Sequence, residues 1–200
     1  MSNLNQMKEK KYIDKSFKNI IFTNNDKKTT KINKKTKLIS FGNIDLEIDL
    51  LNKNIKINKY NLYDKLMFQG GNMNNWNIEF HDFSINNSKH NIFPRDSNGL
   101  TGCLNFFDIK FKNLDISVEN AACEDALNFV RSNGSLNSIK IIDTLGDALD
   151  ADFSNININD INIKNSKNDC IDFSYGKYRI DKVDIFECGD KGVSVGENSN

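Results

Sequence analysis

The sequence predicts an all-β repeat fold in which each coil contains about 22 residues. An acidic phrase recurs along the second half of the chain, as EDALNF, GDALDADF and NDCIDF, and places Asp125, Asp147 and Asp169 at equal intervals, one coil apart. Apolar and polar residues alternate around each phrase, which indicates strands with one buried face. No stretch shows a convincing helical period, and a repeat of this length without helices has few architectures other than a β-solenoid.

The first strand predicted in each coil carries two apolar columns with a polar residue between them. The first column continues upstream from Leu127 with somewhat longer steps, so six coils are visible. Its members are Ile78, Leu104, Leu127, Leu149, Ile171 and Val193, and the second column contains Phe80, Phe106, Phe129, Ala151, Phe173 and Val195. The intervening residues, which we expect to face outward, are Glu79, Asn105, Asn128, Asp150, Asp172 and Ser194.

Each coil also contains a second strand and a shorter third element. Apolar pairs mark the second strand, namely Ile116/Val118, Ile139/Ile141, Ile161/Ile163 and Val183/Ile185. Single apolar residues mark the third element, namely Leu136, Ile158 and Ile180.

A ladder of polar residues is predicted at the turn that ends the second strand. Asn120, Asp143, Asn165 and Glu187 occupy this turn in successive coils, where corresponding residues stack about 4.8 Å apart. We expect an inward ladder in which Asp143 accepts hydrogen bonds from both Asn neighbours. For Glu187, at the end of the row, a solvated turn is the alternative.

The two ends of the predicted solenoid differ. Residues 1–36 are polar, with the lysine-rich run NNDKKTTKINKKTK, and form either a charged cap or a loose tail. Residues 37–200 form the solenoid, and NIDLEIDLLNKNIKINKY supplies short strands of its first coils. The chain stops at GVSVGENSN, inside a fresh coil and without a visible C-terminal cap. Because open strand edges associate, we expect either end-to-end self-association or a larger parent chain.

Two phrases carry a resemblance to a known fold family. NDCIDFS is similar to the strand-start phrase common in the pectate-lyase-like superfamily, and GDKGVSVG resembles that phrase with one inserted residue. The resemblance covers residues 76–200 well and residues 37–75 weakly. It implies a right-handed parallel β-helix, with a groove on the outward face of one sheet where enzymes of this fold cleave, hydrolyse or epimerise acidic polysaccharides. The residue set of the polygalacturonases is not reproduced, so the resemblance leaves the reaction open.

Composition and charge argue against two classes of partner. The 27 basic and 27 acidic residues cancel, so no global basic field is available to neutralise nucleic-acid phosphates. No segment offers about 18 uninterrupted apolar residues, so we expect no membrane span, and the start of the chain shows no secretory signal.

The four cysteines are predicted to be free thiols. Cys103 and Cys170 occupy equivalent slots three coils apart, as do Cys123 and Cys188, so about 14 Å separates each pair. That distance exceeds the reach of a disulfide, and other pairings would cross between different edges of the coil. Free thiols favour a reducing compartment such as the cytoplasm, although the localisation stays open. The absence of a CxxC motif gives a zinc site little support.

Asp150 and Asp172 are the leading candidates for catalysis, with Asp152 beside them on the outward face. Stacked carboxylates lie about 5 Å apart, which is the separation that a retaining glycosidase uses, and like-charge coupling raises one of the two pKa values. Any pair of stacked Asp in such a solenoid meets this spacing. The alternative is therefore an acidic surface without a catalytic role.

The candidate substrate-binding residues come from two places. Asn105 and Asn128 lie on the predicted outward face, and His90 and Arg95 lie in NNSKHNIFPRDSNGLTG, where the coil grows and a loop must bulge from the stack. Inserted loops are where solenoids usually place function.

Asp147 and Asp169 are the candidate metal ligands. Stacked carboxylates repel one another, and a Ca²⁺ ion, which takes six to eight oxygen ligands, would offset this repulsion. The alternative is that each Asp caps its own turn by accepting backbone hydrogen bonds.

Three functions remain: a carbohydrate-binding or carbohydrate-active protein, a non-catalytic surface or assembly module, and a Ca²⁺-stabilised rod.

Overall fold

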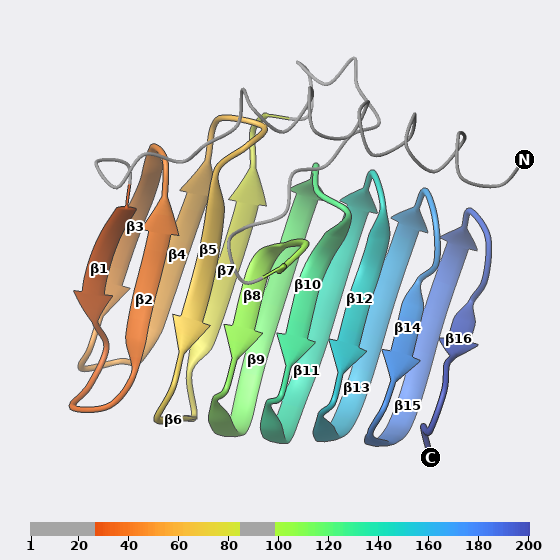
Figure 1. The fold of residues 1–200 in the computed structure, drawn as a ribbon. Coiled ribbons are helices and arrows are strands. Elements are labelled where there is room, and N and C mark those ends of the chain that lie inside the picture. The colour runs from red at the N-terminus through yellow and green to blue at the C-terminus, as the bar shows by residue number, and fades with distance from the viewer. Residues whose placement is uncertain (1–26, 85–98) are drawn as a thin grey trace, which may run out of the picture.

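The computed structural model describes residues 27–84 and 99–200, which form a parallel β-solenoid of about six turns with about 22 residues per turn. The all-β prediction and the coil length are therefore confirmed. Two sheets, here named A and B, form the two long walls of the solenoid (Figure 1). Among the described residues, no helix is long and apolar enough to cross a membrane.

From β7 onward, the strands alternate along the chain between the two sheets, so each coil contributes one strand to each sheet. Sheet A contains, in spatial order, β1 (Lys27–Lys31), β2 (Lys37–Phe41), β5 (Lys65–Gln69), β8 (Gly102–Phe107), β10 (Asp125–Val130), β12 (Asp147–Asp152), β14 (Ile171–Ser174) and β16 (Val193–Val195). Sheet B contains β15 (Lys177–Cys188), β13 (Asn155–Ser166), β11 (Asn133–Thr144), β9 (Lys110–Ala121), β7 (Asn77–Asp82), β4 (Asn54–Lys59) and β3 (Ile44–Asp49), and the short β6 (Asn72–Asn74) pairs with β9. From β8 onward, neighbouring strands within each sheet are parallel.

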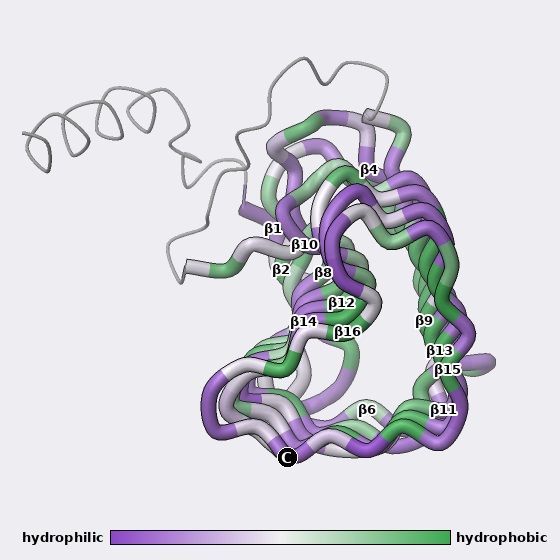
Figure 2. Tube along the Cα trace, turned by 90° about the vertical axis from the view of Figure 1, so that its right-hand side faces the viewer, coloured by the Kyte–Doolittle hydropathy of each residue, from purple (hydrophilic) through white to green (hydrophobic). Residues whose placement is uncertain are grey.

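The core lies between the two sheets and follows the predicted columns. Figure 2, which looks at the end where the C-terminus lies, shows that the coils share one outline, so equivalent residues lie behind one another. The rings of Phe106 and Phe129 stack in this interior with centroids 4.8 Å apart. The register neighbours of the first column are Leu104, Leu127, Leu149, Ile171 and Val193, as the spacing predicts. Each fully buried side chain of this kind contributes about 1.5–3 kcal/mol to the stability of the fold.

Two residues that spacing assigned to the first strand of the coil belong to the other sheet. Ile78 and Phe80 lie on β7 of sheet B and pair with β9, so placing them in the columns of Leu104 and Phe106 is wrong. Glu79, between them, accordingly lies on sheet B. The upstream neighbour of Leu104 is Leu66, and this one coil is much longer than the others because an insertion separates β7 from β8. Both sheets have the same alternation, so spacing alone could not tell them apart.

The second strand and the third element of each coil are one continuous strand of 12 residues, as in β9, β11, β13 and β15. Between β9 and β11 the register shifts around Leu136, which marks a bulge within the strand pair. Leu136, the predicted third element of this coil, therefore lies at the irregularity, and Ile139 and Ile141 of the second strand lie after it.

The N-terminal end of the solenoid is closed by antiparallel pairs. β1 pairs with β2, β2 with β5, and β3 with β4. The stretch NIDLEIDLLNKNIKINKY, expected to supply strands of the first coils, thus forms the β3–β4 hairpin, and β4 starts the parallel ladder by pairing with β7. Within the predicted polar segment 1–36, residues 27–31 form the edge strand β1, and residues 1–26 lie outside the described residues.

At the opposite end, β15 and β16 are the last strands of the two sheets. Val193 and Val195 continue the apolar columns and are 46% and 64% exposed. The expectations of end-to-end self-association or a larger parent chain stay predictions.

The polar residues one position before the ends of β9, β11, β13 and β15 share one backbone conformation. Asn120, Asp143, Asn165 and Glu187 all have φ of 58° or 59°, in the left-handed region that Asn and Asp tolerate better than most residues. Asn165 donates a hydrogen bond to Asp143 as predicted, whereas the amide of Asn120 contacts Nε2 of His81 at 3.1 Å. The ladder is therefore confirmed for one pair of neighbours.

The four cysteines form two disulfides, so the prediction of free thiols is wrong. Cys103 is bonded to Cys123 and Cys170 to Cys188, with Cα–Cα distances of 5.5 and 5.4 Å. Each bond joins the start of a sheet A strand to the end of a sheet B strand, because the coil closes there within 20 or 18 residues. Cys188 also aligns with Ala121, two residues before the slot inferred from spacing. The argument for a reducing compartment therefore loses its basis.

Candidate functional site

The three candidate catalytic carboxylates share the outer face of sheet A. Asp150 on β12 and Asp172 on β14 are register partners, and Asp152 follows Asp150 by two residues, so it emerges on the same face. All three are half-buried. Leu149 and Ala151, which flank Asp150 in the sequence, are buried in the core. The structure thus brings these acids together in one row across neighbouring coils.

Asp150 is the most perturbed of these acids. The Asn128 side chain donates from Nδ2 to Oδ2 of Asp150 at 2.7 Å and to Oδ2 of Asp125 at 3.0 Å. Burial, and after it the neighbouring negative charges, first that of Asp125, raise the pKa of Asp150 to about 9. Asp150 is therefore protonated at neutral pH.

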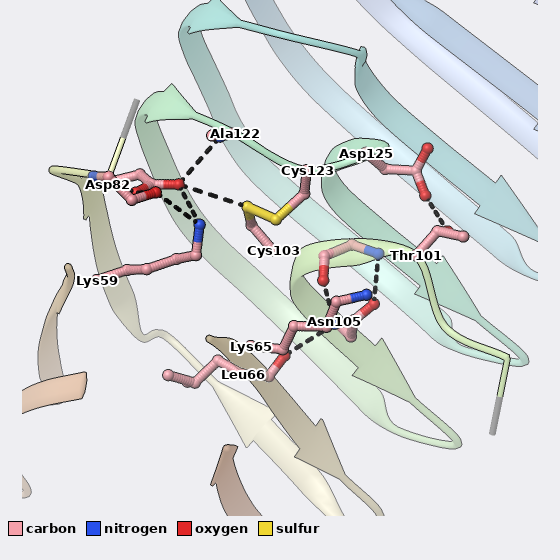
Figure 3. Close-up of a disulfide and its surroundings, with 12 residues drawn as sticks. Lys59, Lys65, Leu66, Asp82, Thr101, Cys103, Asn105, Ala122, Cys123 and Asp125 are labelled. Atoms are coloured by element: carbon pink, nitrogen blue, oxygen red, sulfur yellow. Dashed lines mark hydrogen bonds and ion pairs between the residues drawn. A yellow bond between two sulfur atoms is a disulfide. The ribbon is translucent and has the colours of Figure 1, made fainter. Parts of the chain in front are cut away.

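Asp125 completes this cluster at the start of β10. Burial raises the pKa of Asp125 to about 6. The Thr101 hydroxyl donates to its Oδ2 (Figure 3). The Asn128 amide donates to the same oxygen, and both hydrogen bonds oppose the shift. Oδ1 of Asn128 is buried without a hydrogen-bond partner in the described part of the chain. Because two carboxylates are gathered around one amide with little solvent, the cluster keeps a proton over a wide pH range.

The two candidate substrate-binding amides are buried beneath the surface. Asn105 and Asn128 are each 2% exposed. Asn105 accepts a hydrogen bond from the backbone N of Gly102 at 3.1 Å and donates one to the carbonyl of Leu66 at 2.9 Å, so it fixes the start of β8 (Figure 3). Asn128 orients the acids. Both side chains hold the site in place, and direct contact with a substrate stays a prediction for them.

The outer face of sheet A has a covered half and an open half. The covered half lies over β2, β5 and β8, where an apolar cluster is buried, consisting of Ile39, Met67 and Leu100 with Phe41, Phe107 and Val130 packed against it. The open half lies over β12 and β14, where the acids are. His90 and Arg95, the other candidate substrate-binding residues, lie outside the described residues.

An exposed aromatic pair borders the open half. Phe153 and Tyr175 follow β12 and β14 directly, are 55% and 38% exposed, and stack with ring centroids 4.8 Å apart and planes 12° from parallel. Both have φ of 52°. Sequence reasoning missed Phe153, but a signal was present: Arg131, Phe153 and Tyr175 recur once per coil, each three residues after a predicted outward residue.

Asp147 and Asp169, the candidate Ca²⁺ ligands, make hydrogen bonds to the next coil. Oδ1 of Asp147 accepts from the backbone N of Asp169 at 2.8 Å, and Oδ1 of Asp169 accepts from the backbone N of Lys191 at 2.8 Å. Each carboxylate therefore caps a backbone N–H group, as in the alternative to calcium binding, but this group belongs to the next coil and not to the turn of the Asp itself. Within residues 27–84 and 99–200, no group of three or more His, Cys, Asp or Glu side chains has a metal-binding arrangement. Calcium binding stays a prediction.

A buried ion pair lies next to the Cys103–Cys123 disulfide (Figure 3). Nζ of Lys59 is 2.5 Å from Oδ2 of Asp82, and neither side chain is exposed. The same oxygen accepts from the backbone N of Ala122 at 3.0 Å, so the pair ties β4 and β7 to the closure of the next coil. Burial lowers the pKa of Lys59, and the charge of Asp82 opposes this shift. Sequence reasoning missed the pair because Lys59 sits in a Lys- and Asn-rich stretch beside the exposed Lys56.

Comparisons of the chain with protein-family models, with curated proteins and with solved structures found no match.

Proposed function

We propose that the open half of the outer face of sheet A binds a polysaccharide strand and that Asp150 donates a proton to a glycosidic oxygen of this strand. The observation that carries the proposal is a protonated carboxyl, Asp150, beside a second carboxylate, Asp172, on a face bordered by stacked exposed aromatic rings.

The aromatic pair supports binding. Sugar rings have an apolar face whose C–H groups pack against the negative face of an aromatic ring, and the rings of Phe153 and Tyr175 offer such surface next to the acids. Isolated exposed aromatic residues are common, but two parallel rings beside a polar row form a patch of the kind found at binding sites. The pair spans two coils, so a polymer that crosses the coils contacts both positions.

The carboxylates support hydrolysis. Cleavage of a glycosidic bond needs an acid whose pKa is high enough to keep its proton at neutral pH, and a second carboxylate as nucleophile or base. Asp150 fits the first role. Asp172 fits the second, because residues paired on neighbouring strands lie about 4.8 Å apart, near the separation of about 5–5.5 Å in retaining enzymes.

The test is an assay of new reducing ends, with neutral and acidic polysaccharides, on the wild type and on Asp150→Asn and Asp172→Asn. We expect each variant to lose activity by roughly 10²–10⁴-fold, the usual contribution of a positioned acid or base. Asp184→Asn is the matched control, because Asp184 is an exposed acid on β15 of sheet B, and it should retain activity. Activity that survives in Asp150→Asn contradicts the assignment of the acid.

The alternative is a non-catalytic surface or assembly module, in which the regular stacking of coils is the whole function. It predicts that the wild type releases no reducing ends and binds none of the polymers. Binding without product would keep the polysaccharide role and remove the proton-transfer role of Asp150.

A further inference from the structure

A hollow lies on sheet B, away from the acids of sheet A. It has a volume of about 400 Å³ and is lined by Asn52, Asn75, Trp76, Asn77, Asn113, Asp115 and Asn137. Most of these residues are Asn, and only Asp115 carries a charge. We propose that this hollow binds a neutral sugar unit through its amides and the carboxylate of Asp115.

The hollow lies at an irregularity in the pairing of β9 with β11. Lys112 pairs with Ser135 and Leu114 pairs with Leu136, so Asn113 between them has no partner in β11. It has φ of 53°, and its Nδ2 contacts Oδ1 of Asn75 at 3.3 Å. β11 compensates with Asn137, which has no partner in β9, so the register is the same on the two sides of the irregularity. Asn113 and Asn137, one from each strand, both line the hollow.

Two more walls come from neighbouring segments. The turn of the β3–β4 hairpin supplies Asn52, whose Nδ2 donates to Oδ2 of Asp49 at 2.7 Å. Asn75, at the corner before β7, has φ of 57°, and its backbone N donates to the carbonyl of Lys112 at 2.8 Å. The amides at the rim are thus held by local hydrogen bonds, which reduces the entropy that a ligand would have to overcome.

Only one of the two oxygens of the Asp115 carboxylate accepts hydrogen bonds from the described residues. Its Oδ1 accepts from Nδ2 of Asn137 at 2.9 Å and from the Ser138 hydroxyl at 2.5 Å. Its Oδ2 receives no hydrogen bond from the residues that the structure describes. The first two bonds fix the carboxylate, and the second oxygen is left as an acceptor in the hollow.

This set of groups matches the hydroxyls of a sugar. A hydroxyl donates to a carboxylate oxygen and accepts from an amide N–H, and the hollow offers both partners. The carboxylate of Asp115 repels an anionic sugar, which favours a neutral one. The indole of Trp76, which is 7% exposed, adds an apolar edge. Ligand sites have volumes of about 300–1,000 Å³, so this hollow accommodates one or two sugar rings.

The test uses Trp76 as a local reporter, because it is the one tryptophan in the chain. Its fluorescence is titrated with cellobiose, maltose and, as an anionic probe, glucuronate. We expect a saturable change with at least one neutral disaccharide and none with glucuronate. Asp115→Asn should weaken the binding by roughly 10-fold to 100-fold, since a hydrogen bond to a charged group contributes about 1.5–3 kcal/mol. Asn113→Gly removes a wall but keeps the left-handed backbone, and should weaken binding as well.

Two controls separate this site from the rest of the molecule. Asp160 occupies the position of Asp115 two coils further on and is paired with Lys182, so Asp160→Asn should leave the titration unchanged. Asp150→Asn should do the same, because Asp150 lies on sheet A; the proposal thus stands or falls separately from hydrolysis. The absence of a saturable change with both disaccharides overturns the proposal. A change that persists in Asp115→Asn at full strength also overturns it.

Discussion

Asp150 shows how the chemistry of one side chain depends on its surroundings. Its place in a row of stacked acids leads to the expectation of like-charge repulsion. Burial, however, raises its pKa more than the neighbouring charges do. Around it, Asn128 donates hydrogen bonds to Asp150 and Asp125, and the Thr101 hydroxyl donates to Asp125 at the start of β10. The spacing of residues in the sequence contains no information on that packing.

We expect Asp150→Asn to stabilise the protein at neutral pH and to flatten the pH dependence of its stability. The pKa of Asp150 is about 9 in the folded protein and has its ordinary value of 3.8 when exposed. Between these values the folded state holds a proton that the unfolded state has released, so the free energy of unfolding of the wild type falls as the pH rises. The variant has no such group to titrate.

Thermal unfolding from about pH 4 to about pH 9 checks this expectation. The variant should have a Tm a few degrees higher than the wild type at neutral pH, at about 2–4 °C for each kcal/mol in a chain of this size. The difference should shrink toward the acidic limit, where Asp150 is protonated in both states. Equal slopes for the two proteins would contradict the burial of this acid.

At the scale of strands and coils, most of the fold was predictable because the solenoid repeats its environment every turn. The column that contains Leu104 and Leu127 follows from spacing alone, and so does the pairing of Asn165 with Asp143. The bulging loop between β7 and β8 was expected from the longer step, but Ile78 was assigned to the wrong sheet, since a strand of sheet B has the same alternation as a strand of sheet A. Closure of the coil was also missed, because it brings residues 18 or 20 apart into contact across a corner.

The closure of two coils by disulfides gives a direct prediction. Alkylation of the unfolded, non-reduced protein followed by mass measurement should label no cysteine, and prior reduction should allow four labels. Each bond closes a loop of about 20 residues, so reduction should lower the free energy of unfolding by about 3 kcal/mol per disulfide. Four labels without reductant would show that the thiols are free after all. Ser substitutions at Cys170 and Cys188, tested together, separate the contribution of the second bond.

At the scale of the whole molecule, the two candidate sites lie on different walls of the solenoid. Sheet A carries Asp150 and Asp172 beside a pair of aromatic rings, and sheet B carries an amide-lined hollow. The sequence predicted that Asp150 and Asp172 are neighbours because they occupy the same repeat position, and the register confirms that they are paired. It did not identify Phe153, which follows the acidic row by one residue, or the hollow, which depends on a bulge at Asn113. Features that occur in every coil are visible in a sequence, whereas features that occur once depend on the three-dimensional packing.

The central claim is that a polysaccharide binds across the coils on the open half of sheet A. Its most direct test is the change in Tm caused by neutral and acidic polysaccharides, measured on the wild type and on the double variant Phe153→Asn/Tyr175→Asn. Asn tolerates the left-handed backbone at both positions, so the turn is preserved. The control is Tyr60→Asn/Phe83→Asn, which removes another exposed stacked pair, with centroids 5.4 Å apart. We predict that one polymer raises the Tm of the wild type and of the control but not that of the first variant. A rise that survives the loss of Phe153 and Tyr175, or no rise with any polymer, would contradict the account.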